Sequence, residues 1–309
     1  MSPLCLGGNP FGWTADEETS FAVLDAYAEA GGNFIDTADM YTFHVPGNSG
    51  GESETIIGRW LKARGCRDRM VIATKVGALP GLADLAPETI RRAAEDSLRR
   101  LGTDHIDLYF AHVDDPGTPL AETLAAFDAL VRAGTVRHIA ASNFTADRLA
   151  ESLETSAREG FAAYVALQAE YNLVQREDYE RDLAPVVTGA GLACLPYVAL
   201  ARGFLTGKYR PGGPGVDSPR AGQARAHLNG NGPGVLAALE EVAAAHRTTL
   251  PAVALAWLAA QPTVATPVAG ARNAAQLADL LPFLTLRLTA DEFALLDKVS
   301  ARPSADSPA

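Results

Sequence analysis

Four polar side chains with complementary chemistry follow three apolar runs of the sequence. Asp36 and Tyr41 come just after one short apolar run, Lys75 ends a second, and His112 follows a third. Side chains just beyond the carboxyl ends of parallel strands lie on one face of an α/β barrel, where such barrels place their chemistry. We therefore expect these four residues to form one site.

The four residue types together could protonate an oxygen atom as it becomes negative. The ordinary pKa of a phenol is about 10, and we expect the ammonium of Lys75 to lower the pKa of Tyr41. Asp36 would hold Lys75 in place, and His112 could orient a substrate oxygen. Hydride transfer to a carbonyl carbon leaves an alkoxide, so this set suits carbonyl reduction. Each residue alone has a common structural explanation, but their recurrence at consecutive strand ends favours a site.

Apolar runs and helical patterns alternate along the whole chain. Strands are expected at residues 4–6, 34–36, 70–75, 106–111, 136–141, 165–168, 192–196 and 264–268. Helices are expected at residues 17–30, 52–64, 87–100, 120–132, 147–158, 177–188, 235–245, 251–261, 273–280 and 291–300, with one long loop at 197–233. This alternation predicts a (β/α)8 TIM barrel of the α/β class.

The domain organisation follows from the same pattern. A doubly wound open sheet would need a G-x-G-x-x-G turn after the first strand, and residues 7–12 lack that spacing. The sequence predicts a single barrel domain over residues 1–300, followed by a disordered Ser/Pro/Ala-rich tail at 301–309.

Composition and charge argue against several other classes of protein. The 309 residues are 48% hydrophobic, enough for one large core, and the net charge of −11 disfavours nucleic-acid and membrane partners. The longest apolar stretch, 252–260, is far shorter than the ~20 residues of a membrane span. The start has no features of a signal peptide. The three cysteines lie far apart without metal-ligand spacing, so we expect no metal, no disulfide framework and a cytoplasmic setting.

Longer segments carry a resemblance to a known family. They are residues 33–41 (Asn-Phe-Ile-Asp-Thr-Ala-Asp-Met-Tyr), 51–58, 73–77, 107–112, 142–144, 168–173, 201–209 and 267–272. In these segments the sequence resembles the aldo-keto reductase superfamily, in the branch with potassium-channel β-subunits and bacterial reductases. The resemblance implies an NADPH-dependent reductase of aldehydes, ketones or keto-sugars. It also implies that Tyr41 is the general acid, that Lys75 and Asp36 tune it, and that His112 orients the substrate.

The resemblance further implies how NADPH would be held. Ser142, Asn143 and Gln168 match the residues that bond the nicotinamide carboxamide, and Tyr197 matches the aromatic residue that stacks on its ring. The other implied cofactor contacts are Leu200, Arg202, Gly203, Leu205, Lys208, Arg220, Gly270, Ala271, Arg272, Gln276 and Asp279. Lys208 and Arg220 would offset the repulsion between an anionic cofactor and an acidic chain. Arg272 favours NADPH because a guanidinium can hold a 2′-phosphate with two hydrogen bonds.

The sequence departs from the family pattern in three places. Val198 and Ala199 replace a usual Ser-Pro pair, and Leu280 stands where an Asn commonly contacts the adenine. We expect these changes to weaken cofactor binding or to shift the preference for NADPH. The family's N-terminal hairpin is missing or very short, for which we expect a cost in stability rather than in catalysis.

The substrate pocket and the partners are less determined by the sequence. Candidate pocket walls are Trp13, Phe43, His44, Val113, Asp114 and Phe144. The expected partner is a small carbonyl compound, with a monomer or homo-oligomer as the assembly. Two further functions stay open at this point. One is a sensor or regulatory subunit that binds NADPH and turns over slowly, and the other is a sugar dehydratase or epimerase.

Overall fold

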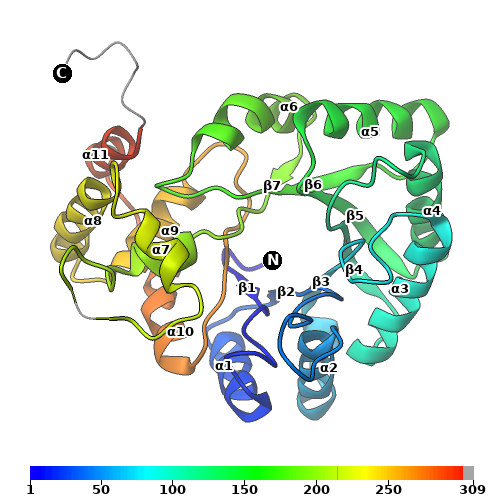
Figure 1. The fold of residues 1–309 in the computed structure, drawn as a ribbon, viewed down its shortest axis with the longest axis horizontal. Coiled ribbons are helices and arrows are strands. Elements are labelled where there is room, and N and C mark those ends of the chain that lie inside the picture. Colours follow the sequence, from blue (N-terminus) through cyan, green and yellow to red (C-terminus); the bar gives the residue numbers. More distant parts are fainter. Residues whose placement is uncertain (214, 302–309) are drawn as a thin grey trace.

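Strands and helices alternate in the order expected of a (β/α)8 barrel. The computed structural model describes residues 1–213 and 215–301. The strands are β1 (Cys5–Gly7), β2 (Phe34–Asp36), β3 (Val71–Val76), β4 (Ile106–Ala111), β5 (Val136–Ser142), β6 (Tyr164–Gln168), β7 (Ala193–Cys194) and β8 (Val268–Ala269). They surround the centre of the molecule, and the helices form an outer ring (Figure 1).

The outer ring contains long helices and several short helical segments. The α-helices are α1 (Glu17–Glu29), α2 (Glu52–Arg64), α3 (Pro87–Leu101), α4 (Leu120–Arg132), α5 (Ala146–Glu159), α6 (Ala184–Gly189), α7 (Ala221–Ala226), α8 (Gly232–His246), α9 (Leu250–Ala259), α10 (Ala274–Leu280) and α11 (Ala290–Ser300). Short 3₁₀ segments are Arg67–Arg69, Ala201–Thr206 and Leu281–Leu284, and a π-helical segment is Tyr179–Leu183. No helix in the part of the chain that the structure describes is both long enough and apolar enough to cross a membrane.

Every named strand pairs in parallel with its neighbours, in the order β7-β6-β5-β4-β3-β2-β1-β8. The two edges then meet. Cys194 of β7 forms a parallel bridge with Val264, and the N–H of Val268 donates to the carbonyl of Pro196 at 2.8 Å. The sheet thus curls into a barrel, and the prediction of a (β/α)8 fold is confirmed.

The strand predicted at residues 264–268 differs from the strand that forms. Val264 makes only an isolated bridge, and β8 begins at Val268. Proline has no N–H to donate to a ladder, so Pro267 prevents a continuous strand across this segment. The apolar pattern located the strand but not its start.

Two predicted segments also differ in their helices. The helix predicted at 177–188 is a π-helical segment followed by α6, whose first turn contains Pro185. A proline in this position cannot donate to the preceding turn, which accounts for the wider π-helical turn before it. The long loop predicted at 197–233 contains the 3₁₀ segment Ala201–Thr206 and the short helix α7. Neither is long enough to show a helical apolar period.

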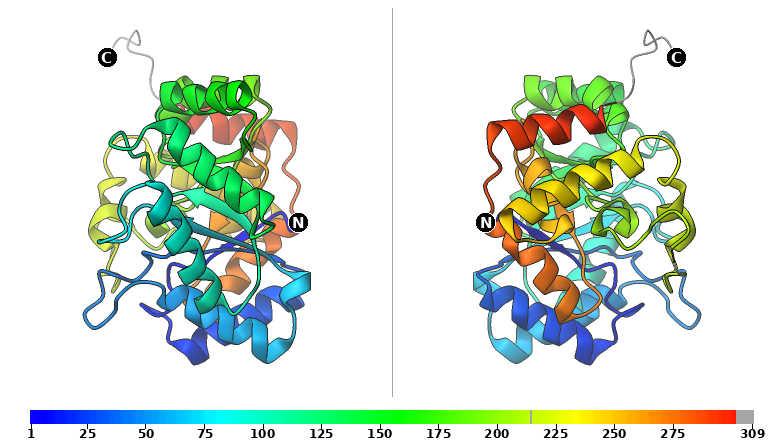
Figure 2. Two further views of the ribbon diagram at one scale, coloured as in Figure 1. Left: turned by 90° about the vertical axis from the view of Figure 1, so that its right-hand side faces the viewer. Right: turned by 90° about the vertical axis from the view of Figure 1, so that its left-hand side faces the viewer.

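The two ends of the barrel differ in their loops. Long connections in blue and yellow-green project from the carboxyl ends of the strands, and the N-terminus lies at the opposite end (Figure 2). The loop between β2 and α2 and the segment between β7 and α8 both belong to the loop-bearing end. Except for Ala301, the tail predicted at 301–309 lies outside the described residues.

The loop that follows β2 contains a buried carboxylate. Asp39 is 0% exposed, and neither of its carboxylate oxygens has a partner among the described residues. Burial, followed by the charge of the buried Glu54, raises the pKa of Asp39 to about 8. The folded protein therefore holds this proton more tightly than the unfolded chain, whose Asp pKa is about 3.9. The associated stability is complete below about pH 4 and is lost as the pH rises through 8.

We expect Asp39→Asn to remove this pH dependence, since the amide never ionises. At pH 8.5 the variant should be more stable than the wild type by a few kcal/mol, because each pKa unit is worth about 1.4 kcal/mol. At pH 5 the difference should be much smaller. Urea unfolding at the two pH values measures this difference in stability. Asp178→Asn is the control, because the side chain of Asp178 is 97% exposed. An equal difference at both pH values would contradict the role of Asp39.

Candidate active site

The four residues predicted to act together meet at the carboxyl ends of β2, β3 and β4. The Nζ of Lys75 donates to both carboxylate oxygens of Asp36, at 2.6 and 2.7 Å, and to the carbonyl of Thr37 at 2.7 Å. It also donates to the hydroxyl of Tyr41 at 3.0 Å, and that hydroxyl donates to Asp36 Oδ2 at 3.1 Å. Lysine, carboxylate and phenol therefore form one connected network.

The buried ion pair of this network depends on having all its partners. Lys75 is 0% and Asp36 1% exposed. Two charges out of water are tolerated only when good geometry and further hydrogen bonds compensate them. The Thr37 carbonyl provides one such bond, and the rings of Tyr41 and Phe110 lie 4.8 and 5.6 Å from the ammonium. The strand alternation of β3 directs Lys75 to the barrel interior.

The pKa of Tyr41 moves in the opposite direction to the one expected from Lys75 alone. Burial, followed by the charge of Asp36 and the hydrogen bond to it, raises the pKa of the Tyr41 hydroxyl well above its ordinary value. The expectation of a lowered pKa is therefore wrong, because the desolvation of the phenol and the nearby carboxylate dominate. Tyr41 keeps its proton at neutral pH.

His112 completes the group as a neutral imidazole. Its ring lies edge-on to Tyr41, with 6.1 Å between the ring centroids. Burial, followed by the charge of Lys75, lowers the pKa of His112 to about 3. Its Nδ1 is buried and has no partner among residues 1–213 and 215–301. Because Nδ1 is buried and His112 lines the smaller cavity, Nε2 is the ring nitrogen that can meet a substrate.

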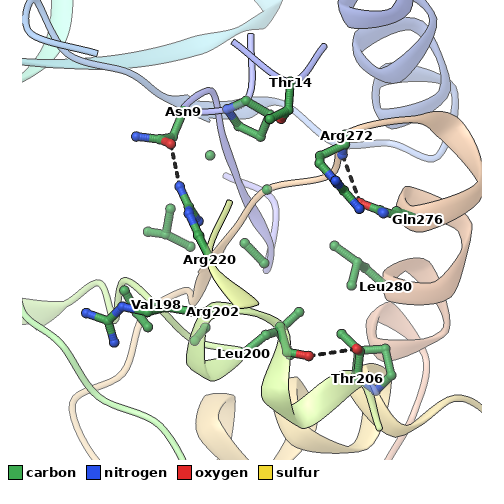
Figure 3. A pocket seen from close by; sticks show the side chains of 18 of the residues that line it. Asn9, Thr14, Val198, Leu200, Arg202, Thr206, Arg220, Arg272, Gln276 and Leu280 are labelled. Atoms are coloured by element: carbon green, nitrogen blue, oxygen red, sulfur yellow. Dashed lines mark hydrogen bonds between the residues drawn. The ribbon is translucent and has the colours of Figure 1, made fainter. Parts of the chain in front are cut away.

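Two adjoining cavities open beside this network. The smaller, of about 340 Å³, is lined by residues that include Tyr41, His44, His112, Ser142, Asn143, Gln168 and Tyr197. The larger is a groove of about 460 Å³. Its predicted residues are Trp13, Tyr197, Leu200, Arg202, Gly203, Lys208, Arg220, Gly270, Arg272, Gln276 and Asp279 (Figure 3). Tyr41 lines both cavities, so the phenol stands at their junction.

Some predicted site residues lie elsewhere. Leu205 and Ala271 are fully buried beside the groove instead of lining it, and Phe144 packs in the core against Tyr164, with 5.7 Å between ring centroids. Phe43 and Val113 line neither cavity. A sequence motif gives the position of a residue in the chain but not the direction of its side chain.

Asp114 is also absent from both cavities, and several lining residues were missed, among them Asn9, Met40 and Thr42. Asp114 is engaged by Arg148, whose Nε lies 2.9 and 3.0 Å from the two carboxylate oxygens. Asn9 lines both cavities and Met40 lines the smaller one. Asn9 follows β1 as Asp36 ends β2, so its position past a strand end was the signal that could have found it.

The groove carries cations that have no carboxylate partner. Lys208, Arg220 and Arg272 form no ion pair within the described part of the chain, whereas Arg202 pairs with Glu170 at 2.7 Å. Burial, followed by the charge of Arg272, lowers the pKa of Lys208, so these two cations act on each other. Three unpaired cations in one groove favour a ligand with several negative charges.

Arg220 reaches across the groove from the loop before α7. Its guanidinium donates to the side-chain oxygen of Asn9 (Figure 3). It also lies 5.3 Å from the ring centroid of Trp13. At the far end of the groove, the side-chain oxygen of Gln276 accepts from the N–H of Arg272 at 3.1 Å. The cations are thus spread along the groove instead of gathered at one point.

Amide side chains occupy the end of the smaller cavity near the barrel centre. The Nε2 of Gln168 donates to Asp36 Oδ1 at 2.9 Å. A carboxylate only accepts hydrogen bonds, so the orientation of this amide is fixed and its Oε1 stays available. Asn143 donates to the carbonyl of His112 at 2.8 Å and accepts from the hydroxyl of Tyr197 at 2.8 Å. These contacts hold Tyr197 beside His112.

Comparisons with known proteins agree with this geometry. A model of the Aldo/keto reductase family matches residues 3–301. The chain is 32% identical to the uncharacterized oxidoreductase YrpG of Bacillus subtilis over 100% of this chain and 95% of that protein. It is 34% identical to the norsolorinic acid reductase stcV of Emericella nidulans over 94% of this chain and 76% of that one. Protein tas of Escherichia coli is 32% identical over 97% and 94%. This protein is therefore an oxidoreductase of the aldo/keto reductase family.

Proposed function

We propose that the protein reduces the carbonyl group of an aldehyde, ketone or keto-sugar to the alcohol, with NADPH as the cofactor. The observation that carries this proposal is the hydroxyl of Tyr41, which lies 3.0 Å from Lys75 Nζ where the two cavities join. A protonated phenol placed between a groove lined by cations and a small pocket can give its proton to a substrate oxygen.

The groove residues fit a nicotinamide dinucleotide. Lys208, Arg220 and Arg272 offer charge to phosphates, and the face of Tyr197 borders both cavities. Gln168 Oε1 can accept from a carboxamide NH₂ while Nε2 stays on Asp36. The family as a whole generally uses such a cofactor, which supports the assignment.

The residues of this chain divide the reaction between them. When bound, the nicotinamide would supply a hydride to the carbonyl carbon. His112 Nε2 would donate a hydrogen bond to the carbonyl oxygen, and Tyr41 would transfer its proton as negative charge develops there. Lys75 lies beside the phenol, so its charge would stabilise the phenolate that remains. Asp36 would keep that ammonium fixed in place.

At two of the family departures, Val198 and Leu280, an apolar side chain stands in place of a polar one. Val198, Ala199 and Leu280 all line the groove. They can pack against the cofactor but cannot hydrogen-bond to it. The specificity for the phosphate therefore depends more on the cations Lys208 and Arg272.

We expect Arg272→Ala to lower the affinity for NADPH by about 10- to 100-fold, since a charge-assisted contact with a phosphate is worth about 1.5–3 kcal/mol. The affinity for NADH should change by less than about 3-fold. Titrations of both cofactors, followed by fluorescence, measure this. Arg287→Ala is the matched control, because Arg287 is an exposed arginine outside the groove. An equal loss for both cofactors would show that Arg272 does not contact the 2′-phosphate.

The proposed function is tested by following NADPH absorbance with the wild-type protein and a panel of aldehydes, ketones and keto-sugars. Oxidation of NADPH with formation of the matching alcohol is the expected result. Reductase names among the relatives, such as norsolorinic acid reductase, place carbonyl compounds first in the panel. Tight NADPH binding without turnover of any carbonyl would instead favour a sensor. A dehydrated or epimerised product without net reduction would assign the site to sugar modification.

A further inference from the structure

One carboxylate, Glu52, ties together the loop that begins directly after Tyr41. Its Oε2 accepts from the hydroxyl of Thr42 at 2.5 Å and from the N–H of Gly50 at 3.1 Å. Its Oε1 accepts from the N–H of Ser49 at 2.7 Å. Glu52 thus joins the first residue of the loop to its last residues.

Glu52 is suited to remain an anion in this place. It is the first residue of α2, where the unpaired N–H groups of the helix favour negative charge. Although burial raises the pKa of Glu52, hydrogen bonds from Thr42, Ser49 and Gly50 lower it below the ordinary value. The contacts of the loop with this carboxylate therefore persist at neutral pH.

Thr42 is held in a backbone conformation that its side chain disfavours. Its φ is 72°, in the left-handed region, and the residue is 1% exposed. A β-branched residue is an outlier there because its side chain crowds the backbone. Such a conformation persists only when surrounding contacts determine it. For Thr42 the determining contact is the hydrogen bond that its hydroxyl donates to Glu52 at 2.5 Å. The carbonyl oxygen of Tyr41 lies equally near, at 2.5 Å, but the hydroxyl has a single proton and the charged carboxylate is the stronger acceptor.

The conformation of Thr42 decides where Tyr41 points. Tyr41 lies beyond the end of β2, and its own N–H makes only a long bond of 3.3 Å to the carbonyl of Ala38. If Thr42 relaxed to an ordinary φ, the carbonyl of Tyr41 would rotate and the phenol would move. Its hydroxyl could not then keep its distances of 3.0 Å to Lys75 and 3.1 Å to Asp36.

We propose that Thr42 and Glu52, here called the Thr42–Glu52 clamp, are positioning residues that hold the hydroxyl of Tyr41 at Lys75 and Asp36. Thr42 borders the smaller cavity and Glu52 borders neither cavity, but the positioning role requires no contact with a substrate. The clamp keeps a strained backbone in place, and the strained backbone sets the position of the proton donor. The inference rests on the proposed function only as far as turnover is used to observe it.

The test compares four variants by kcat, KM and cofactor affinity. Thr42→Ser keeps the hydroxyl, and its kcat should stay within 3-fold of the wild type. Thr42→Val keeps the β-branched shape but loses the bond to Glu52, so its kcat should fall about 10- to 100-fold, as misplacement of a reacting group by about 1 Å can do. Thr42→Gly adopts φ near 72° without strain, so its kcat should lie between these two. Glu52→Gln should lower kcat, because the amide NH₂ of the new side chain would face groups that now donate hydrogen bonds to Glu52.

Cofactor affinity should stay unchanged in all of these variants. Glu18→Gln is the matched control, since Glu18 is exposed in the first turn of α1, and it should behave as the wild type. A purely structural role would instead make Thr42→Gly the worst variant, because glycine removes the hydroxyl and its bond to Glu52 and adds freedom to the unfolded chain. A kcat of Thr42→Gly below that of Thr42→Val would overturn the proposal. So would a Thr42→Val kcat within 2-fold of the wild type.

Crystal structures separate this proposal from the proposed function. If the wild type reduces no carbonyl, the function proposed above fails, and the clamp is judged from Tyr41 alone. In Thr42→Val the distance between the Tyr41 hydroxyl and Lys75 Nζ should exceed hydrogen-bond range, whereas Thr42→Ser should keep it near 3.0 Å. An unmoved Tyr41 in Thr42→Val would overturn the clamp whatever the activity.

Discussion

Replacing Tyr41 by Phe is expected to lower kcat by about 10²-fold or more and to leave the affinity for NADPH unchanged. The change removes one hydroxyl and keeps the ring. Without it, the developing alkoxide has no proton donor within reach, because His112 is neutral with a pKa lowered to about 3 and Lys75 is committed to Asp36. Steady-state NADPH oxidation and a separate cofactor titration measure the two effects.

A second tyrosine offers the control for this substitution. Tyr164 is buried, and its hydroxyl has no hydrogen-bond partner among the residues that the structure describes. Tyr164→Phe therefore removes the same atom from a core position and should keep wild-type turnover. If Tyr41→Phe also kept wild-type turnover, proton donation by Tyr41 would be refuted.

Replacing Lys75 by Met is expected to reduce both turnover and stability. The change leaves the carboxylate of Asp36, 1% exposed, buried without its cation. Breaking a buried pair in this way costs about 3–5 kcal/mol. Turnover should fall by about 10²-fold or more, since the phenolate of Tyr41 would form without an adjacent positive charge.

A double substitution separates the two effects of Lys75. In Asp36→Asn/Lys75→Met both charges are absent, so urea unfolding should show much of the lost stability restored. Turnover should stay low, because the ammonium beside Tyr41 is still missing. Recovery of turnover in the double variant would show that Lys75 acts only through the fold.

The barrel and the meeting of Asp36, Tyr41, Lys75 and His112 could be predicted because both follow from where strands end. Asp36 ends β2, Lys75 is the last but one residue of β3, and His112 follows β4. Neighbouring parallel strands bring their carboxyl ends together. A pattern of apolar runs shows this without knowledge of side-chain packing. The start of β8 could not be predicted in the same way, because the absent N–H of Pro267 matters only once the partner strand is known.

The pKa of Tyr41 and the placement of several groove residues depend on three-dimensional packing. A lysine near a phenol lowers its pKa, but burial and Asp36 raise it more, and the balance requires all the distances. Phe144 and Leu205 fall within family motifs, yet they face the core. The 3₁₀ segment before Lys208 was missed because residues with positive φ, including Arg202, interrupt any regular period.

The hydrogen bond between Gln168 and Asp36 joins two parts of the chain with separate tasks. The four residues proposed to carry proton transfer come from residues 36–112, and the unpaired cations of the groove come from residues 208–272. Under the proposed function, mutations among the cations of the second part would change the choice of cofactor with less effect on proton transfer. A substitution of Gln168 would alter both tasks at once, because its side chain bonds Asp36. Arg220 and Tyr197 also connect the two parts, through their bonds to Asn9 and Asn143.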